Sequence, residues 1–170
     1  MTSTGYLSKV NQKLLYARVL VERIRAGEES GHRRDMLVEA LVFQLYLLHR
    51  FHLQEIAAAY ECPGCEQVVD GASLSLVLNE IGKEPAEARE ILALLEQGDS
   101  WLSLLIGAFN ACFRIQAPGK GTRGHDTLAI TATDITENLS APALEDETII
   151  GWFDALEELV ERHRELMVEF

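Results

Sequence analysis

Apolar residues recur at helical spacing along three long stretches of the chain, residues 6–25, 36–60 and 149–170. Within each stretch they lie three and four residues apart, which is the period of an α-helix that buries one face. The first stretch has this spacing at Leu7, Val10, Leu14, Ala17, Val21 and Ile24. The pattern predicts three long helices, with three shorter ones between the second and the last, near 73–81, 85–97 and 100–115.

Residues with special backbone preferences predict the ends of these helices. Gly27, Gly82 and Gly98 are suited to terminate helices, because glycine readily adopts the left-handed conformation that follows a last turn. Asp35 is positioned to cap the second long helix, and Pro85 suits the first turn of the helix over 85–97. Cys62-Pro63 must end the second helix, since proline moves the residue before it out of the helical region. Asp99 or Ser100 can cap the helix over 100–115.

The second helix is apolar nearly all round, so we expect it to run through the middle of a bundle. The first and last helices have complementary charge. Residues 1–27 hold five basic residues against one acid, whereas residues 148–170 hold six acids against two basic residues. We therefore expect these two helices to be neighbours, although exposed ion pairs contribute only about 0–1 kcal/mol each.

Residues 117–147 interrupt the helical pattern with glycines, prolines and a β-prone alternation of Leu128, Ile130 and Ala132 with threonines and Ala129. We predict an irregular excursion here, whose middle lies extended across the helices. The fold class predicted for the chain is all-α. The architecture is a helical bundle of five to six helices in a single domain, residues 1–170, with this excursion before the last helix.

The charge balance excludes some classes of partner. With 27 acidic and 15 basic residues the net charge is −12, which argues against nucleic acid and anionic membranes as main partners. The most apolar stretch, 36–60, contains too many polar and charged residues for a bilayer core. The first residues lack the apolar run of a secretory signal, and the chain has only three cysteines. We expect a cytoplasmic protein.

Cys62-Pro63-Gly64-Cys65 is the sharpest short motif and has three interpretations. A redox dithiol is disfavoured, because Cys62 follows a helix and faces the negative end of the helix dipole. A zinc site needs two further ligands, for which the nearest candidates are His49 and His52. Pro-Gly is also the preferred centre of a type II turn, and a plain turn is the interpretation that we favour. The third cysteine, Cys112, fits a small core residue.

Three ionisable residues are predicted to face the interior: His52, Glu55 and His163. Gln44 lies on the same polar seam of the second helix as His52 and Glu55. These side chains could form a proton-transfer or cofactor-binding group, or they could be buried residues that hydrogen-bond one another, which is the commoner case. Arg162 and Arg164 flank His163 on the outer side.

The segment 119–125 is rich in glycine and positively charged. Its backbone amides, together with Lys120 and Arg123, could hold a phosphate or a carboxylate. It departs from a Walker A loop, because glycine follows the Gly-Lys and a helix precedes it. A solvated loop without a ligand is the alternative that we favour.

The chain as a whole resembles a family of small bacterial proteins known as a domain of unknown function. The resemblance is carried by residues 11–17, by Glu55-Ile56-Ala57 with Tyr60, by residues 99–102, and by Trp152 with residues 162–165. It implies an all-helical soluble protein with no assigned activity. The cysteine motif is outside the family pattern. Asn11 and Lys13, within the first of these segments, could pair with a neighbouring helix or line a small polar pocket.

No convergent catalytic motif or cofactor signature is visible, so we expect a non-enzymatic protein without a cofactor. It would act through protein contacts, as a homodimer or with another protein. The alternative is a binder of a small anion or a metal. That binder would use the 119–125 loop, or His49 and His52 with Cys62 and Cys65.

Overall fold

The structure, a computed structural model, describes residues 3–114 and 144–168. These residues form six α-helices and one 3-10 helix. The helices are α1 (Ser3–Ala26), α2 (His32–Ala59), η1 (Cys65–Gln67), α3 (Gly71–Glu80), α4 (Ala86–Glu96), α5 (Trp101–Ala111) and α6 (Asp146–Val168). The predicted all-α bundle is confirmed.

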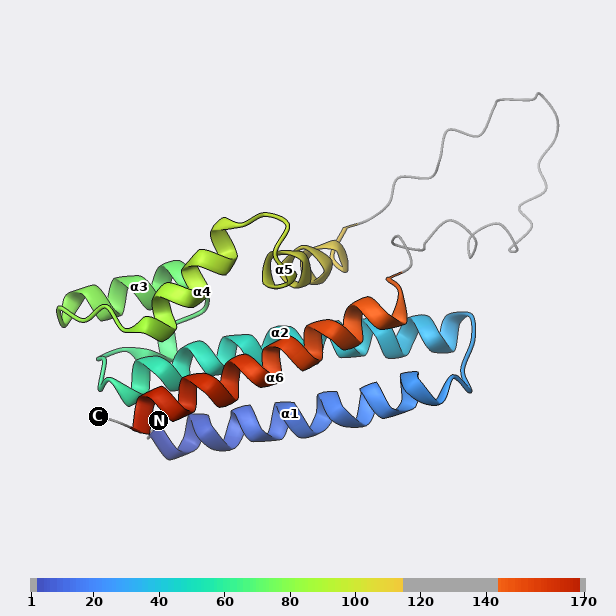
Figure 1. The fold of residues 1–170 in the computed structure, drawn as a ribbon, viewed down its shortest axis with the longest axis horizontal. Coiled ribbons are helices and arrows are strands. Elements are labelled where there is room, and N and C mark those ends of the chain that lie inside the picture. Colours follow the sequence, from blue (N-terminus) through green and yellow to red (C-terminus); the bar gives the residue numbers. More distant parts are fainter. Residues whose placement is uncertain (1–2, 115–143, 169–170) are drawn as a thin grey trace, which may run out of the picture.

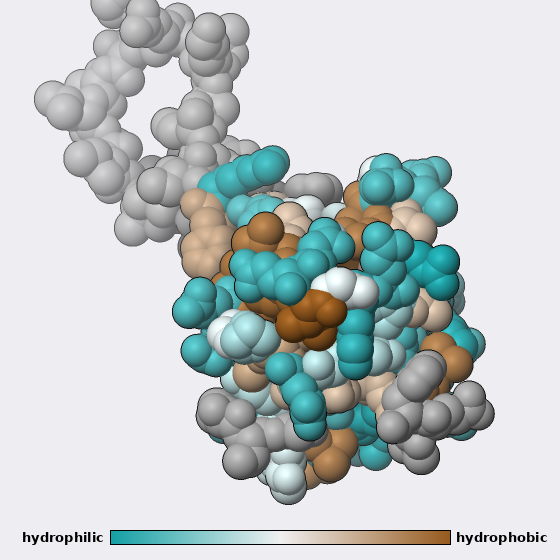
Figure 2. Space-filling model, turned by 90° about the vertical axis from the view of Figure 1, so that its left-hand side faces the viewer, coloured by the Kyte–Doolittle hydropathy of each residue, from teal (hydrophilic) through white to brown (hydrophobic). Residues whose placement is uncertain are grey.

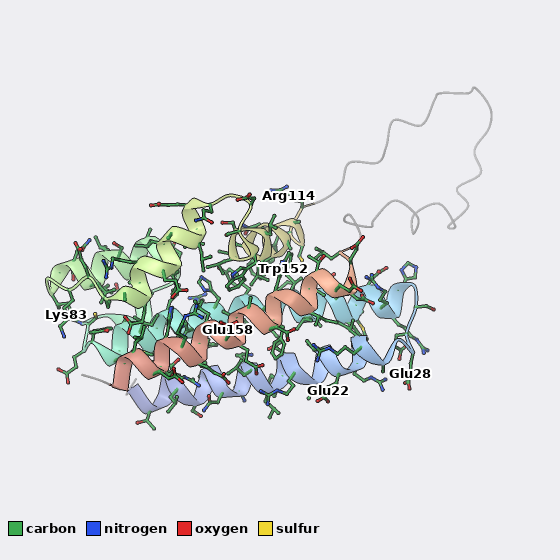
Figure 3. The ribbon with its side chains drawn as sticks, viewed as in Figure 1. Glu22, Glu28, Lys83, Arg114, Trp152 and Glu158 are labelled. Carbon is green, nitrogen blue, oxygen red and sulfur yellow. The ribbon has the colours of Figure 1, made fainter. Side chains whose placement is uncertain are left out.

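The three long helices α1, α2 and α6 run alongside one another, and α3, α4 and α5 lie over α2 on the side away from α1 (Figure 1). Helix α2 contacts α1, α3, α5 and α6, which confirms its predicted central position. Trp152 lies between α6 and α5 (Figure 3). The arrangement follows from the sequence, because the helix with the widest apolar surface has the most neighbours to bury it.

One hydrophobic core contains buried residues from all six α-helices. Its largest fully buried side chains lie on every helix, namely Tyr6, Leu41, Leu45, Leu48, Leu53, Ile56, Leu74, Leu78, Ile91, Leu102, Leu105 and Ile149. At about 1.5–3 kcal/mol for each large apolar side chain, this burial is the main stabilising contribution to the fold. The inward positions predicted for α1 are confirmed at Val10, Leu14, Ala17, Val21 and Ile24, whereas Leu7 is exposed.

Most predicted helix ends match the structure. Gly27 and Gly82 follow α1 and α3 with φ of 63° and 67°, and Ser100 caps α5 by accepting a hydrogen bond from Ser103 N. Two ends differ. Helix α2 begins at His32, about one turn before the start that a cap at Asp35 would give, so Asp35 lies in the first turn of the helix. Pro85 is the residue before α4 rather than its first helical residue.

The end of α5 corrects two predictions. The helix stops at Ala111 instead of continuing to 115, and only Leu102 and Leu105 of its apolar residues are buried. Cys112 is exposed and is not a core residue, and Phe113 is 65 % exposed. The apolar period of α5 therefore continues beyond the part of the helix that the core can cover.

The predicted excursion over 117–147 extends too far at its end, because Asp146 already begins α6. Its remaining part up to residue 143, including the alternation at 128–132 and the 119–125 loop, lies outside the described residues. The single domain over 1–170 stays a prediction.

Complementary charges do join the first and last helices, as predicted. Arg18 and Glu157 are 2.5 Å apart, and Arg25 and Asp154 are 3.5 Å apart. Three of these four side chains are more than half exposed, so the pairs orient α1 against α6 more than they stabilise the contact.

Among the described helices, none is by itself both long and apolar enough to cross a membrane. Together, α4 and α5 reach the necessary length and composition, but they are bent by 64° at the break between them.

Candidate functional site

Two histidines from different helices meet in the core of the bundle. His52 of α2 and His163 of α6 are both fully buried, and His52 Nε2 lies 3.0 Å from His163 Nδ1. The outer nitrogen of each ring contacts a glutamate: His52 Nδ1 is 3.1 Å from Glu55 Oε2, and His163 Nε2 is 3.1 Å from Glu90 Oε2. The four side chains form a continuous line, Glu55–His52–His163–Glu90, which we call the histidine chain.

An arginine binds each end of the histidine chain. Arg164 donates from Nε to Glu55 Oε1 at 3.0 Å and from Nη1 to Asn11 Oδ1 of α1 at 2.9 Å. At the other end, Arg162 donates to Glu90 Oε1 at 2.5 Å and also contacts Glu158, which is labelled on α6 in Figure 3. The connected polar groups therefore extend through the bundle from α1, through α2 and α6, to α4.

The alternation of Arg162, His163 and Arg164 on α6 explains this arrangement. Successive residues of a helix point about 100° apart, so an inward His163 sends its two neighbours to opposite sides. One guanidinium consequently meets the carboxylate of α4 and the other meets the carboxylate of α2.

The electrostatics of the histidine chain follow from burial and from these charges. Burial lowers the pKa of His163, as does the neighbouring His52, while Glu90 opposes both effects. Burial raises the pKa of Glu90, but hydrogen bonds from Arg162 and His163 outweigh it, so the net shift is downward. Glu90 is therefore ionised at neutral pH.

The sequence prediction identified part of this group. His52, Glu55 and His163 face the interior as expected, and the structure brings all three into contact. Gln44 does not join them, because it accepts a hydrogen bond from Lys13 Nζ at 3.1 Å. Lys13 of α1 therefore pairs with α2, and Asn11 of α1 pairs with Arg164 of α6. Pairing with a neighbouring helix is the first of the two roles predicted for these residues.

The sequence analysis missed three polar residues that take part in the interior contacts: the buried Gln54 and Glu87, and the partly exposed Glu90. Gln54 donates to the carbonyls of Glu66 and Val68, and so anchors the turn that follows α2. Glu87 is 1 % exposed and accepts a hydrogen bond from Tyr60 Oη at 3.1 Å. In sequence, Glu87 and Glu90 look like ordinary surface acids of a short helix, and no local signal sets them apart.

His49 lies on α2 one turn before His52 but has a different environment. It is 2 % exposed, and its Nδ1 has no hydrogen-bond partner among the described residues. Burial lowers its pKa to about 3, and the neighbouring His52 adds to the effect. His49 is therefore neutral at physiological pH.

The cysteine motif forms a turn. Gly64 adopts φ 73° and ψ 23°, the left-handed conformation that the third position of a type II turn requires, and η1 begins at Cys65. Cys62 and Cys65 are free and buried, and burial raises the pKa of the Cys62 thiol, with Cys65 contributing. A raised pKa disfavours the thiolate that redox chemistry needs.

The other predicted ligand sites can be compared with the described residues only in part. Within residues 3–114 and 144–168, no group of three or more His, Cys, Asp or Glu side chains is arranged to hold a metal ion. His52 faces His163 and Glu55 instead of joining His49 and the two cysteines. Lys120 and Arg123 lie outside the described residues.

A second feature is an apolar surface where α5 ends beside α2. Phe109 stacks on Tyr46 with ring centroids 3.6 Å apart, and it meets Phe43 edge-on at 5.1 Å. Phe113 continues the cluster, 5.2 Å from Phe109 and 5.8 Å from Phe43. We call this surface, with the adjacent Met36, the aromatic face.

A depression of about 400 Å³ adjoins the aromatic face, and it is lined by His32, Asp35, Met36, Glu39, Ala40 and Phe43. Met36 is 63 % exposed. By contrast, hydrophobic residues are interspersed with hydrophilic ones at the end of the bundle that carries α3 and both termini (Figure 2). Large exposed apolar groups that adjoin one another mark interaction surfaces more often than scattered ones do.

Comparison with known proteins identifies a family but no activity. No curated protein and no solved structure matches the chain. A family model does match, over residues 1–170, and its description is a family of unknown function, DUF6586. The expected membership of an uncharacterised family is thus confirmed, and the chain belongs to DUF6586.

Proposed function

We propose that this protein acts through protein contacts and that it forms a homodimer through the aromatic face. The observation that carries the proposal is the cluster of four aromatic rings beside an exposed methionine. Aromatic residues and methionine are enriched in the cores of protein interfaces, where lysine and glutamate are depleted. Phe113 and Met36, both more than 60 % exposed, would be the first residues covered.

A second copy of the chain is the partner that the charges support best. The net charge of −12 disfavours nucleic acid and anionic membranes. The rim of the aromatic face carries both positive and negative charge, because Arg33 and Glu39 lie about one turn to either side of Met36 on α2. In a two-fold contact with antiparallel α2 helices centred at Met36, Arg33 of one copy lies at the level of Glu39 of the other. An isologous interface needs this self-complementarity.

The proposed location is the cytoplasm. All three cysteines are free, two of them buried, which fits a reducing compartment. His52, His163 and Glu55 of the histidine chain are buried and contact one another or an arginine, which favours a non-enzymatic role over catalysis at that place.

The test is the solution mass of the full chain over a range of concentrations, by sedimentation velocity or light scattering. The wild type is expected at twice the chain mass, and Phe113→Glu at the mass of one chain, because a charge in the interface centre would have to be desolvated. The matched control is Leu15→Glu, which changes a residue that is 56 % exposed on the outer side of α1.

Two outcomes contradict the proposal. One is a wild-type mass of a single chain at all concentrations. The other is a dimer that withstands Phe113→Glu and dissociates with Leu15→Glu, which would move the interface to α1.

Thiol labelling gives an independent readout. Cys112 directly precedes Phe113 of the aromatic face. Partial burial and the charge of Glu39, which lines the depression, raise the pKa of its thiol. It is exposed, whereas Cys62 and Cys65 are buried. Labelling of Cys112 by a maleimide should slow as the protein concentration rises in the wild type and stay constant in Phe113→Glu.

A further inference from the structure

The histidine chain contains three contacts of hydrogen-bond length in series. Glu55 Oε2 to His52 Nδ1, His52 Nε2 to His163 Nδ1, and His163 Nε2 to Glu90 Oε2 measure 3.1, 3.0 and 3.1 Å. The two ring planes differ by 22° and the centroids are 5.2 Å apart, so the rings meet edge to edge and their inner nitrogens face each other. Each contact needs one hydrogen atom between its two heavy atoms.

The number of protons decides whether all three contacts can be hydrogen bonds. Two neutral imidazoles carry two N–H groups in total, and an ionised carboxylate carries none. If both outer nitrogens donate to their glutamates, the inner nitrogens present lone pairs to each other at 3.0 Å in the core. Both histidines are 0 % exposed, so water does not separate them. A third proton removes this conflict.

The glutamates are poor places for that proton. The second oxygen of Glu55 accepts a hydrogen bond from Arg164, and the second oxygen of Glu90 accepts one from Arg162. Both guanidiniums favour ionised carboxylates. The histidines are the remaining groups that can carry the proton.

We propose that the core of the bundle is a binding site for one proton, shared by His52 and His163, and that the site stays occupied above the pH at which an ordinary histidine is neutral. With this proton one ring donates from both nitrogens, while the other accepts on Nδ1 or Nε2 and donates from its remaining nitrogen. All three hydrogen bonds are then made.

Charged groups from each packed helix explain why the site takes one proton and resists a second. The carboxylates Glu55, Glu87 and Glu90 attract the first. Two imidazolium rings would place N–H against N–H at the inner contact, and Arg162 and Arg164 add further positive charge. His49 is neutral, and α1 contributes only the uncharged Asn11, through Arg164. The lowered pKa of His163, which burial and His52 cause, is consistent with a disfavoured second proton.

Occupancy of this site links the helices, because the histidine chain joins α2, α4 and α6. The folded protein holds a proton that the unfolded chain releases above the ordinary histidine pKa of about 6.5. Unfolding therefore becomes more favourable as the pH rises. While the site stays occupied, its contribution to the unfolding equilibrium constant increases up to tenfold per pH unit.

The direct test is ¹⁵N NMR of the imidazoles in the full wild-type chain near pH 8, about 1.5 units above the ordinary histidine value. One buried imidazole with both nitrogens protonated, and a nitrogen–nitrogen coupling across the inner hydrogen bond, are expected. Spectra in which every buried histidine is neutral overturn the proposal. His49 should appear neutral throughout and serves as the internal reference.

The variant His163→Asn supplies a second test. An asparagine amide can reach the position of Nδ1 and donate to His52 without an extra proton, while Glu90 keeps Arg162. We compare the equilibrium constants of unfolding of the wild type and the variant from about pH 7 to 9, a range above the ordinary histidine pKa. The ratio of the wild-type constant to the variant constant should rise up to tenfold per pH unit. His32→Asn, on the exposed first residue of α2, is the control that should leave the wild-type dependence unchanged. Equal pH dependence of wild type and His163→Asn overturns the proposal, and if this variant fails to fold, the NMR result decides.

Discussion

At the scale of single residues, the two arginines beside His163 have unequal roles although they are almost adjacent in sequence. Arg164 contacts Glu55, which is 4 % exposed, and its own side chain is 24 % exposed. Arg162 contacts Glu90 in a pair whose side chains are 42 % and 37 % exposed. Water can replace Arg162 more easily than it can replace Arg164. The stability of the fold should therefore depend much more on Arg164.

Replacing each arginine by methionine tests this difference. Arg164→Met leaves the buried Glu55 carboxylate without its guanidinium and should lower the free energy of unfolding by about 3 kcal/mol, the usual cost of an uncompensated buried charge. Arg162→Met should cost about 1 kcal/mol or less, as exposed pairs do. Urea denaturation of both variants measures the two values, and equal losses would show that Glu55 is solvated in the folded protein.

At the scale of secondary-structure elements, α2 ends in an unusual way. The N–H groups of Glu61 and Cys62 donate to the carbonyls of Ala58 and Ala57, at 3.1 and 2.9 Å, which is the hydrogen-bond pattern of a Schellman motif. The left-handed position of this motif normally belongs to glycine, but here Glu61 occupies it with φ 57°. Pro63 then prevents the helix from continuing.

Glu61→Gly should therefore stabilise the protein. The substitution removes the left-handed penalty of a non-glycine residue, about 1–2 kcal/mol, and part of this gain is lost to the greater freedom of glycine in the unfolded chain. We expect a net increase of about 0.5–1 kcal/mol in the free energy of unfolding, measured in urea. Glu61→Ala is the control and should give no such gain, because alanine keeps the Cβ. A destabilised Glu61→Gly would contradict the assigned conformation.

At the scale of the whole molecule, the buried His49 makes the stability of the fold depend on pH. His49 has a pKa of about 3 in the folded protein, against about 6.5 in an unfolded chain. As the pH falls from 6.5 toward 3, the unfolded chain binds a proton that the folded protein does not. The stability that neutral His49 gives is therefore complete above pH 6.5 and is lost on acidification, by up to about 1.4 kcal/mol per pH unit.

His49→Leu should remove this part of the acid sensitivity. The variant also deletes a buried Nδ1 without a partner, so at pH 7 it should be about as stable as the wild type or more so. Its advantage should grow as the pH is lowered to 5, when thermal or urea unfolding is compared at the two values. His32→Leu, at the exposed start of α2, should show no such trend. A constant difference between His49→Leu and wild type would mean that His49 is protonated in the fold.

The residues of the candidate site show how far sequence reasoning reaches. His52, Glu55 and His163 could be assigned to the interior because each occupies an apolar face of its own helix. Glu90 could not, because α4 is short and its acids look alike until the position of α6 against it is known. The exposed end of α5 was missed for the same reason, since an apolar period shows which residues share a face and not whether another helix covers them.

The sequence by itself determined which segments form helices, most of the helix ends, and which side chains share a face. These properties depend on backbone preferences and on a period of a few residues, both of which are local. Only the tertiary structure decided that two histidines 111 positions apart meet in line between two glutamates, and that four aromatic rings gather at the surface. Such contacts depend on how each helix is rotated and placed against the others, which the packing of the whole core sets.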